Sequence, residues 1–159
     1  MASQSREYLS QLRKLDNEIN YKCSRIEEMK ARAAGIGSPG VHSDRVQVSR
    51  GAGIMSDLID RAVDQEKEVQ ELISQYILLR DQIINLIHAL DDPRYIEFLY
   101  LRYIGVPDKR TGKRVYLTIK EIEHTMRRSD GSPYTEKHVC RIHSDALKAL
   151  DAILQDRPV

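Results

Sequence analysis

A seven-residue repeat of apolar residues between Ala62 and Leu90 constrains the fold more than any other feature of this sequence. One row recurs every seven positions, and a second row lies three positions after it. The two rows are Ala62, Val69, Tyr76, Ile83 and Leu90, and Leu72, Leu79 and Leu86. Such a repeat, sustained over about four heptads, is typical of a long helix that packs against another helix. Ile73, Ile84 and Ile87 widen the apolar stripe beyond a two-helix seam.

A weaker heptad pattern precedes it in residues 5–33. Its main row and the interleaved positions are Leu12, Ile19, Ile26 and Ala33, and Tyr8, Leu15 and Met29. Residues 35–56, rich in Gly and Ser, are predicted to form a flexible loop. Such a loop lets the first helix fold back, so residues 1–91 are expected to form a long antiparallel coiled-coil hairpin. We expect this hairpin to dimerise; a monomeric hairpin packed on the rest of the chain is the alternative.

The composition favours an all-α class. Charged residues make up 31% of the 159 residues and aromatic residues only 6%, whereas 41% are hydrophobic, which fits helices with apolar stripes better than a β-sandwich. Every apolar run is too short to span a membrane, and the first residues lack the apolar core of a signal peptide. Cys23 and Cys140 show no disulfide spacing. A cytoplasmic protein is therefore expected.

Charge is distributed unevenly along the chain. Residues 93–159 carry 13 Lys and Arg against 9 Asp and Glu, a net +4, whereas residues 1–92 carry 12 against 15, a net −3. A basic C-terminal half favours a polyanionic partner. An ordinary solvated surface of mixed charge is the alternative on charge alone.

Residues 92–159 contain the start and stop positions of several short helices. Asp92 can cap a helix that has Pro93 at its first position. After a basic loop or short β-ribbon, Thr118 begins a capping box, and a turn then leads to Thr135, a favourable N-cap for the last helix. This order of helix, basic loop, short helix, turn and longer helix predicts a helix-turn-helix DNA-binding domain.

The last helix has two chemically different faces when it is projected at 100° per residue. The apolar face consists of Val139, Ile142, Ala146, Leu150 and Ile153. Opposite it runs a stripe of Lys137, Arg141, Ser144 and Lys148, without an acid at its centre. Lys and Arg donate to guanine edges and phosphates, and Ser contacts either. The stripe favours DNA binding over the alternative of a solvated helix face.

These observations predict that helix 135–150 inserts into the major groove of double-stranded DNA. Lys137 and Arg141 are the leading candidates for base contacts, Glu136 could accept from cytosine N4, and Lys148 could contact a phosphate. The complete set of expected DNA-binding residues is Glu136, Lys137, His138, Arg141, Ser144, Lys148, Lys113, Arg114, Lys120, Arg127 and Arg128.

A metal site is not expected in the last helix, although His138, Cys140 and His143 lie close in sequence. His138 and Cys140 project about 160° apart on a helix, so one ion could not bind both. Cys140 and His143 could share a face, but two ligands are too few for a structural zinc site. The sequence contains no Walker loop and no HExxH or GxSxG motif. No metal, cofactor or catalytic residue is therefore expected, and the chain is not expected to be an enzyme.

The last helix resembles the recognition helix of the sigma-factor domain that reads the −35 promoter element. The positions that carry this resemblance are Thr135, Val139, Ile142, Ala146, Leu147 and Leu150. LTIKEIEHTM is similar to the preceding helix of that domain, with Glu123 in place of its small residue, and FLYLRYI is similar to the leading helix. The region by which sigma factors bind core polymerase is missing, so a complete sigma factor is not expected.

Most of the chain also resembles a group of phage and prophage proteins of Gram-positive bacteria that are similar to activators of late phage genes. Tyr8–Ile19, Asp92–Tyr95, Leu101–Tyr103 and His138–His143 carry this resemblance. It implies a transcription regulator in the cytoplasm of a bacterial host, with RNA polymerase as a further partner. A DNA-recognition subunit of a phage packaging machine and an adaptor that docks on polymerase are the alternatives.

Overall fold

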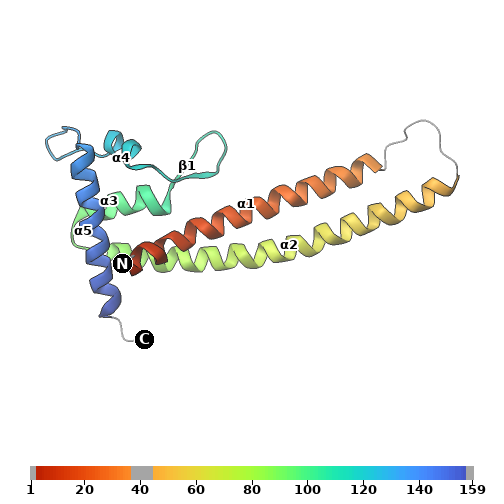
Figure 1. The fold of residues 1–159 in the computed structure, drawn as a ribbon, viewed down its shortest axis with the longest axis horizontal. Helices are drawn as coiled ribbons and strands as arrows, with labels where there is room; N and C mark the ends of the chain where they lie inside the picture. Colours follow the sequence, from red (N-terminus) through yellow and green to blue (C-terminus); the bar gives the residue numbers. More distant parts are fainter. Residues whose placement is uncertain (1–2, 37–44, 157–159) are drawn as a thin grey trace. The chain divides into compact units, whose positions relative to one another are not determined.

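The computed structural model describes residues 3–36 and 45–156, and these are mostly helical (Figure 1). The elements are, in chain order, α1 (Gln4–Ile36), α2 (Arg45–His88), α3 (Pro93–Leu99), the π-helical turn η1 (Tyr100–Ile104), β1 (Val106–Pro107), β2 (Arg114–Val115), α4 (Ile119–Thr125) and α5 (Glu136–Gln155). The expected all-α class is confirmed, and the two long helices α1 and α2 pack together as a hairpin. None of the described helices combines the length and apolar character that a membrane span needs.

The connection between the two long helices is shorter than the predicted loop of residues 35–56. Helix α1 continues to Ile36 and α2 begins at Arg45, so residues 45–56 are helical and that part of the loop prediction was wrong. The remaining positions, 37–44, lie outside the described residues. Gly51 and Gly53 misled the prediction because a glycine costs a helix only about 1 kcal/mol relative to alanine, whereas a proline costs about 3 kcal/mol.

The chain divides into two compact units, and their boundary differs from the expected one near residue 92. One unit is Leu15–Tyr76, and the other combines Met1–Lys14 with Ile77–Val159. The first turns of α1 and the last turns of α2 therefore belong with the C-terminal helices. The heptad pattern runs through both units, so it gives no sign of this division.

The unit Leu15–Tyr76 contains the far part of the hairpin. Ile26, Ala62 and Val69 are buried at its centre, and the partly buried hydrophobic residues against them are Ile19, Cys23, Met29 and Ile73. Lys22 Nζ lies 2.9 Å from Glu68 Oε2, and Lys30 pairs with Glu66. Because the later residue of α1 pairs with the earlier residue of α2, the helices run antiparallel. Lys22 stands between Leu15 and Met29 in the interleaved row of the heptad pattern, where it forms this cross-helix ion pair in place of an apolar contact.

In the second unit, side-chain caps fix where α3 and α4 begin. Asp92 accepts from the backbone N–H of Arg94 (2.9 Å), with Pro93 at the first position of α3, as predicted. The Arg94 side chain also donates to Asp92, and these hydrogen bonds lower the pKa of the Asp92 carboxyl. The predicted capping box is confirmed, since Thr118 N donates to Glu121 Oε2 (2.7 Å) and Glu121 N donates to Thr118 Oγ1.

Helix α3 passes directly into the π-helical turn η1, which ends at Gly105. The Gly105 N–H donates to Tyr100 O (2.8 Å), five residues earlier, and Gly105 has φ 76° and ψ 165°. This conformation is available almost only to glycine. The chain then forms the predicted short ribbon, in which β1 and β2 are antiparallel and Val106 pairs with Val115.

The core of this unit lies where α3 and α4 pack on α5. Phe98, Leu99 and Ile122 are completely buried there. The buried residues of α5 are Val139, Ile142, Ala146, Leu147 and Leu150. The predicted apolar face is therefore confirmed except at its C-terminal end, where Leu147 is buried and Ile153 is only partly buried.

Candidate nucleic-acid interface

Helix α5, which carries the candidate DNA contacts, begins as predicted at an N-cap Thr135. The backbone of Thr135 is extended, with φ −86° and ψ 155°, and Val139 N donates to its carbonyl oxygen (3.0 Å). Its hydroxyl does not cap a backbone N–H; Oγ1 lies 2.6 Å from His138 Nδ1 instead. The first turn of α5 is therefore stabilised by a contact between side chains.

Residues 126–135, which connect α4 to α5, form a closed turn. Arg128 N donates to Ser132 O (2.9 Å), Gly131 N donates to Arg128 O, and Ser132 donates twice to Asp130. These hydrogen bonds from Ser132 lower the pKa of the Asp130 carboxyl. The connection is longer than the usual helix-turn-helix link of about three or four residues, but its internal bonds give it a defined path.

Two of the predicted phosphate contacts, Arg127 and Arg128, lie in this turn. Arg127 is exposed, and Arg128 is half-buried with its guanidinium 5.4 Å from the centroid of the buried Tyr134 ring. Because the turn leads straight into α5, Arg127 is available beside the N-terminal end of the helix. Arg128 is already engaged in a cation–π contact.

The expected stripe of donors on α5 is fully exposed. Lys137, Arg141, Ser144 and Lys148 all face solvent. The Arg141 side chain is 83% exposed, and its Nε lies 3.8 Å from Asp145 Oδ2, one turn further along the helix. An exposed pair of this kind is weak. Asp145 thus partly offsets the positive charge of Arg141, but Arg141 remains exposed on the stripe.

The remaining candidates of the first turn have local roles. Glu136 is an exposed acid in the first turn of α5, where a negative charge interacts favourably with the helix dipole. His138 is exposed and already bonded to Thr135. The structure therefore supplies an ordinary helix-end explanation for both residues, beside the expected contacts with DNA.

The connection between β1 and β2, which contains Lys113, lies apart from α5. Figure 1 shows the connection between β1 and β2 on the far side of α4 from α5. Arg114 Nη1 donates to Gly105 O (3.2 Å) and lies 3.4 Å from Ile104 O, so it ties the ribbon to the end of η1. Lys113 and Lys120 are exposed. Contacts of Lys113, Arg114 and Lys120 with phosphates stay a prediction.

The first turn of α1 packs beside the C-terminal half of α5, a contact that the sequence did not predict. Ser5 is completely buried, its Oγ donates to Leu147 O (3.0 Å), and its N–H donates to Asp151 Oδ1 (2.7 Å). Ser3 Oγ also donates to Asp151 (2.7 Å). Burial opposes ionisation of Asp151, but the bonds from Ser3 and Ser5 lower its pKa. Asp151 thus caps the start of α1 through Ser5, which lies 146 positions away in the sequence.

A hollow of about 450 Å³ separates this α1 turn from part of the stripe. Ser3 and Arg6 of α1 line it together with Ser144 and Lys148 of α5. Cys140 and His143 from the N-terminal half of α5 also line it, whereas Lys137 and Arg141 are not among its lining residues. The two leading candidates for base contacts therefore lie outside the hollow that α1 borders.

The other two residues of the His-x-Cys-x-x-His sequence differ in burial. Cys140 is exposed, whereas His143 is half-buried, with its ring stacked on Phe98 (centroids 4.9 Å apart) and Nε2 2.9 Å from the Tyr103 hydroxyl. Burial, reinforced by the charges of Arg6 and Arg102, lowers the pKa of His143 to about 4. Across residues 3–36 and 45–156, no three His, Cys, Asp or Glu side chains come together as a metal site.

No protein-family model, no curated protein and no solved structure matches this chain.

Proposed function

We propose that this chain is a sequence-specific DNA-binding regulator of transcription, of the phage type, that inserts the N-terminal half of α5 into the major groove. The observation that carries the proposal is the row of exposed donors, Lys137, Arg141, Ser144 and Lys148, on the side of α5 opposite its buried residues. A groove-binding helix needs one face anchored in a core and the other free and rich in donors.

In this mechanism the two halves of α5 have different roles. Lys137 and Arg141 contact base edges, with Glu136 as an acceptor for cytosine N4, and Lys148 contacts the backbone. Arg127, in the turn before α5, contacts a flanking phosphate. RNA polymerase is a further partner in this proposal, contacted once the protein is bound at its site.

The test is a comparison of Arg141→Ala with Lys148→Ala, after the preferred site has been selected from random DNA. Arg141→Ala should weaken binding to that site by about 1–3 kcal/mol, roughly 5- to 150-fold in Kd, and should relax its base preference. Lys148→Ala should weaken binding to all DNA sequences alike and should reduce the salt dependence of binding. Fluorescence anisotropy with labelled duplexes at several salt concentrations measures both effects.

Arg32→Ala is the matched control, because Arg32 is an exposed arginine of α1 outside this unit. It should bind like wild type. Wild-type affinity of both α5 variants would rule out this helix as the DNA reader. If wild-type protein shows no salt-sensitive DNA binding even at low ionic strength, an adaptor that docks on RNA polymerase through protein contacts becomes the better explanation.

We propose further that the hairpin pairs two chains into a homodimer. Ile59 and Val63 of α2 are 45% and 43% exposed, and Val63 borders a groove along the hairpin that Ile26, Val69 and Ile73 also line. Large apolar side chains beside such a groove favour a helical partner. A dimer would recognise two half-sites separated by whole turns of DNA.

Introducing a charge at this surface tests the dimer. Val63→Glu should give the mass of one chain in light scattering at micromolar concentration, where wild type should give twice that mass, because the carboxylate would be buried without a partner. Gln75→Glu adds the same charge at an exposed polar position of α2 and should leave the dimer intact. A monomeric wild type would contradict the proposal, and a ring of more than two chains would favour the packaging subunit.

A further inference from the structure

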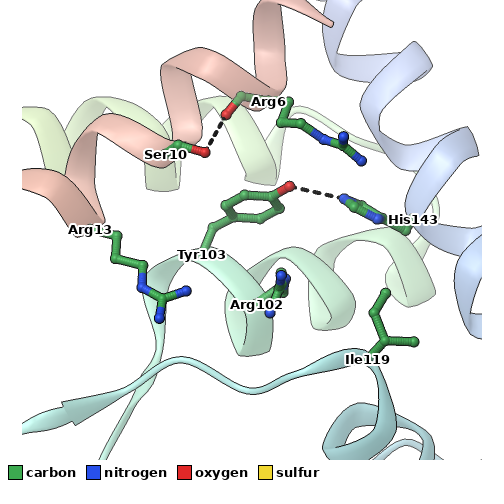
Figure 2. A pocket seen from close by; sticks show the side chains of 7 residues that line it. All are labelled: Arg6, Ser10, Arg13, Arg102, Tyr103, Ile119 and His143. Atoms are coloured by element: carbon green, nitrogen blue, oxygen red, sulfur yellow. Dashed lines mark hydrogen bonds between the residues drawn. The ribbon is translucent and has the colours of Figure 1, made fainter. Parts of the chain in front are cut away.

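Three arginines converge on one cavity in the unit that contains α5. The cavity has a volume of about 390 Å³ and is lined by Arg6, Ser10, Arg13, Arg102, Tyr103, Ile119 and His143. Figure 2 shows these side chains arranged around a common space, with Tyr103 and His143 bonded to each other across it. The volume falls within the range of roughly 300–1,000 Å³ that is usual for small-molecule sites.

The positive charge comes from two elements that are far apart in sequence. Arg6, Ser10 and Arg13 follow one another at spacings of four and three on α1, so they share one face of that helix. Arg102 comes from the π-helical turn η1. Turns of this kind are frequent at functional sites. Among the residues that the structure describes, no carboxylate lines the cavity.

Most of the donor capacity of these arginines is not used by the protein. Arg102 Nη1 donates to Leu117 O (2.9 Å), and the Arg13 guanidinium lies 5.2 Å from the centroid of the Tyr116 ring. Within the described part of the chain, none of the recorded ion pairs involves Arg6, Arg13 or Arg102. Since each guanidinium has five N–H donors, several remain available to a ligand.

The electrostatics of the cavity wall agree with this geometry. The charges of Arg6 and Arg102 add to burial in lowering the pKa of His143 to about 4. Burial raises the pKa of Tyr103, and the same two arginines oppose that rise. His143 is therefore neutral at pH 7, and the cavity has the charge of its arginines. The Ser10 hydroxyl already donates to Arg6 O (2.7 Å), so Ser10 is left mainly as an acceptor.

We propose that this cavity binds the phosphoryl group of a small phosphorylated ligand. Arginine forks match the geometry of phosphate and carboxylate oxygens. Three guanidiniums around one space favour phosphate, because a terminal phosphoryl group offers three oxygens and a charge near −2, whereas a carboxylate offers two oxygens and a single charge. The cavity is larger than a phosphate ion needs, and Ile119 and the Tyr103 ring provide apolar surface for the group that the phosphate is attached to. The proposal does not depend on DNA binding.

The test measures binding of inorganic phosphate, pyrophosphate and a nucleoside triphosphate to the full chain by calorimetry, without DNA and at constant ionic strength. At least one of these should bind the wild type with a measurable heat. In the double variant R6Q/R13Q, the Kd of that compound should rise by about tenfold or more for each guanidinium removed. R6K/R13K keeps the positive charge but loses the forked guanidinium donors, so its Kd should lie between those of wild type and R6Q/R13Q. Binding should also shift the ring resonances of His143.

R32Q removes one arginine from α1 outside the cavity and should bind the ligand like wild type. Circular dichroism of each variant confirms that it is folded. The proposal is overturned if no phosphoryl compound binds at millimolar concentration, if R6Q/R13Q binds as tightly as wild type, or if citrate binds as tightly as pyrophosphate. It is also overturned if R6Q/R13Q weakens the binding of duplex DNA but not of the phosphoryl compounds, which would make the cavity a part of the DNA-binding surface. The α5 variants test DNA binding separately, so the two proposals can fail independently.

Discussion

Phe98→Ala should destabilise the unit that contains α5 by about 3–5 kcal/mol, the usual cost of replacing a buried aromatic ring by a methyl group. Phe98 is completely buried and its ring stacks on His143, with centroids 4.9 Å apart. Its removal takes away the side chain of α3 that supports the middle of α5. Hydrogen exchange of the α5 amides should show the loss most directly, because those amides report on this unit.

A second readout of the same variant comes from the histidine. Burial holds the pKa of His143 near 4, and a cavity beside the ring would admit water and move this pKa back towards the ordinary value of about 6.5. Tyr21→Ala is the control, since the Tyr21 ring is 62% exposed and should change stability by only about 0.5 kcal/mol. A loss below about 1 kcal/mol for Phe98→Ala would show that α3 is not a main support of α5.

Gly105→Ala is expected to have the second-largest effect. The backbone of Gly105, with φ 76° and ψ 165°, is strained by about 1–3 kcal/mol for any residue with a Cβ atom. A Cβ atom there would also lie 2.9 Å from Val115 O and 3.2 Å from the Tyr116 ring. Relief of this overlap requires the ribbon to move, which adds about 1–3 kcal/mol.

Thermal unfolding measures the cost, and Gly112→Ala is the matched control. Gly112 also has a positive φ, 69°, but no atom lies within 4 Å of an added Cβ, so only the conformational cost of about 1–2 kcal/mol applies. A Gly105→Ala loss no larger than that of Gly112→Ala would mean that the chain relaxes around the new methyl group without cost.

Local features of this fold could be predicted from the sequence because each depends on a few neighbouring residues. Asp92 and Pro93 start a helix, and Thr118 and Glu121 satisfy each other's backbone N–H groups, wherever in a protein they occur. The apolar face of α5 likewise followed from its periodicity.

Contacts between distant parts of the chain could not be predicted in this way. Nothing around Ser5 indicates that its side chain is buried against Leu147, or that Asp151 caps α1. For the same reason Arg6, Arg13 and Arg102 did not form a candidate site until the fold brought them together. In the candidate DNA interface, the exposure of the stripe was predictable from helix geometry, whereas the ion pair with Asp145 and the neighbouring α1 turn depend on the packing.

The discontinuity of the unit that contains α5 determines an order of folding. Helices α3, α4 and α5 are close in sequence and can associate through short loops, whereas the bonds from Ser3 and Ser5 to Asp151 close loops of nearly the whole chain. Closing a loop costs more entropy as it lengthens, although the cost rises slowly. During synthesis the hairpin segment Leu15–Tyr76 is made long before α5. The start of α1 can therefore pack on α5 only after this last helix has been synthesised. We therefore expect the docking of the first turn of α1 on α5 to be the step that completes this unit.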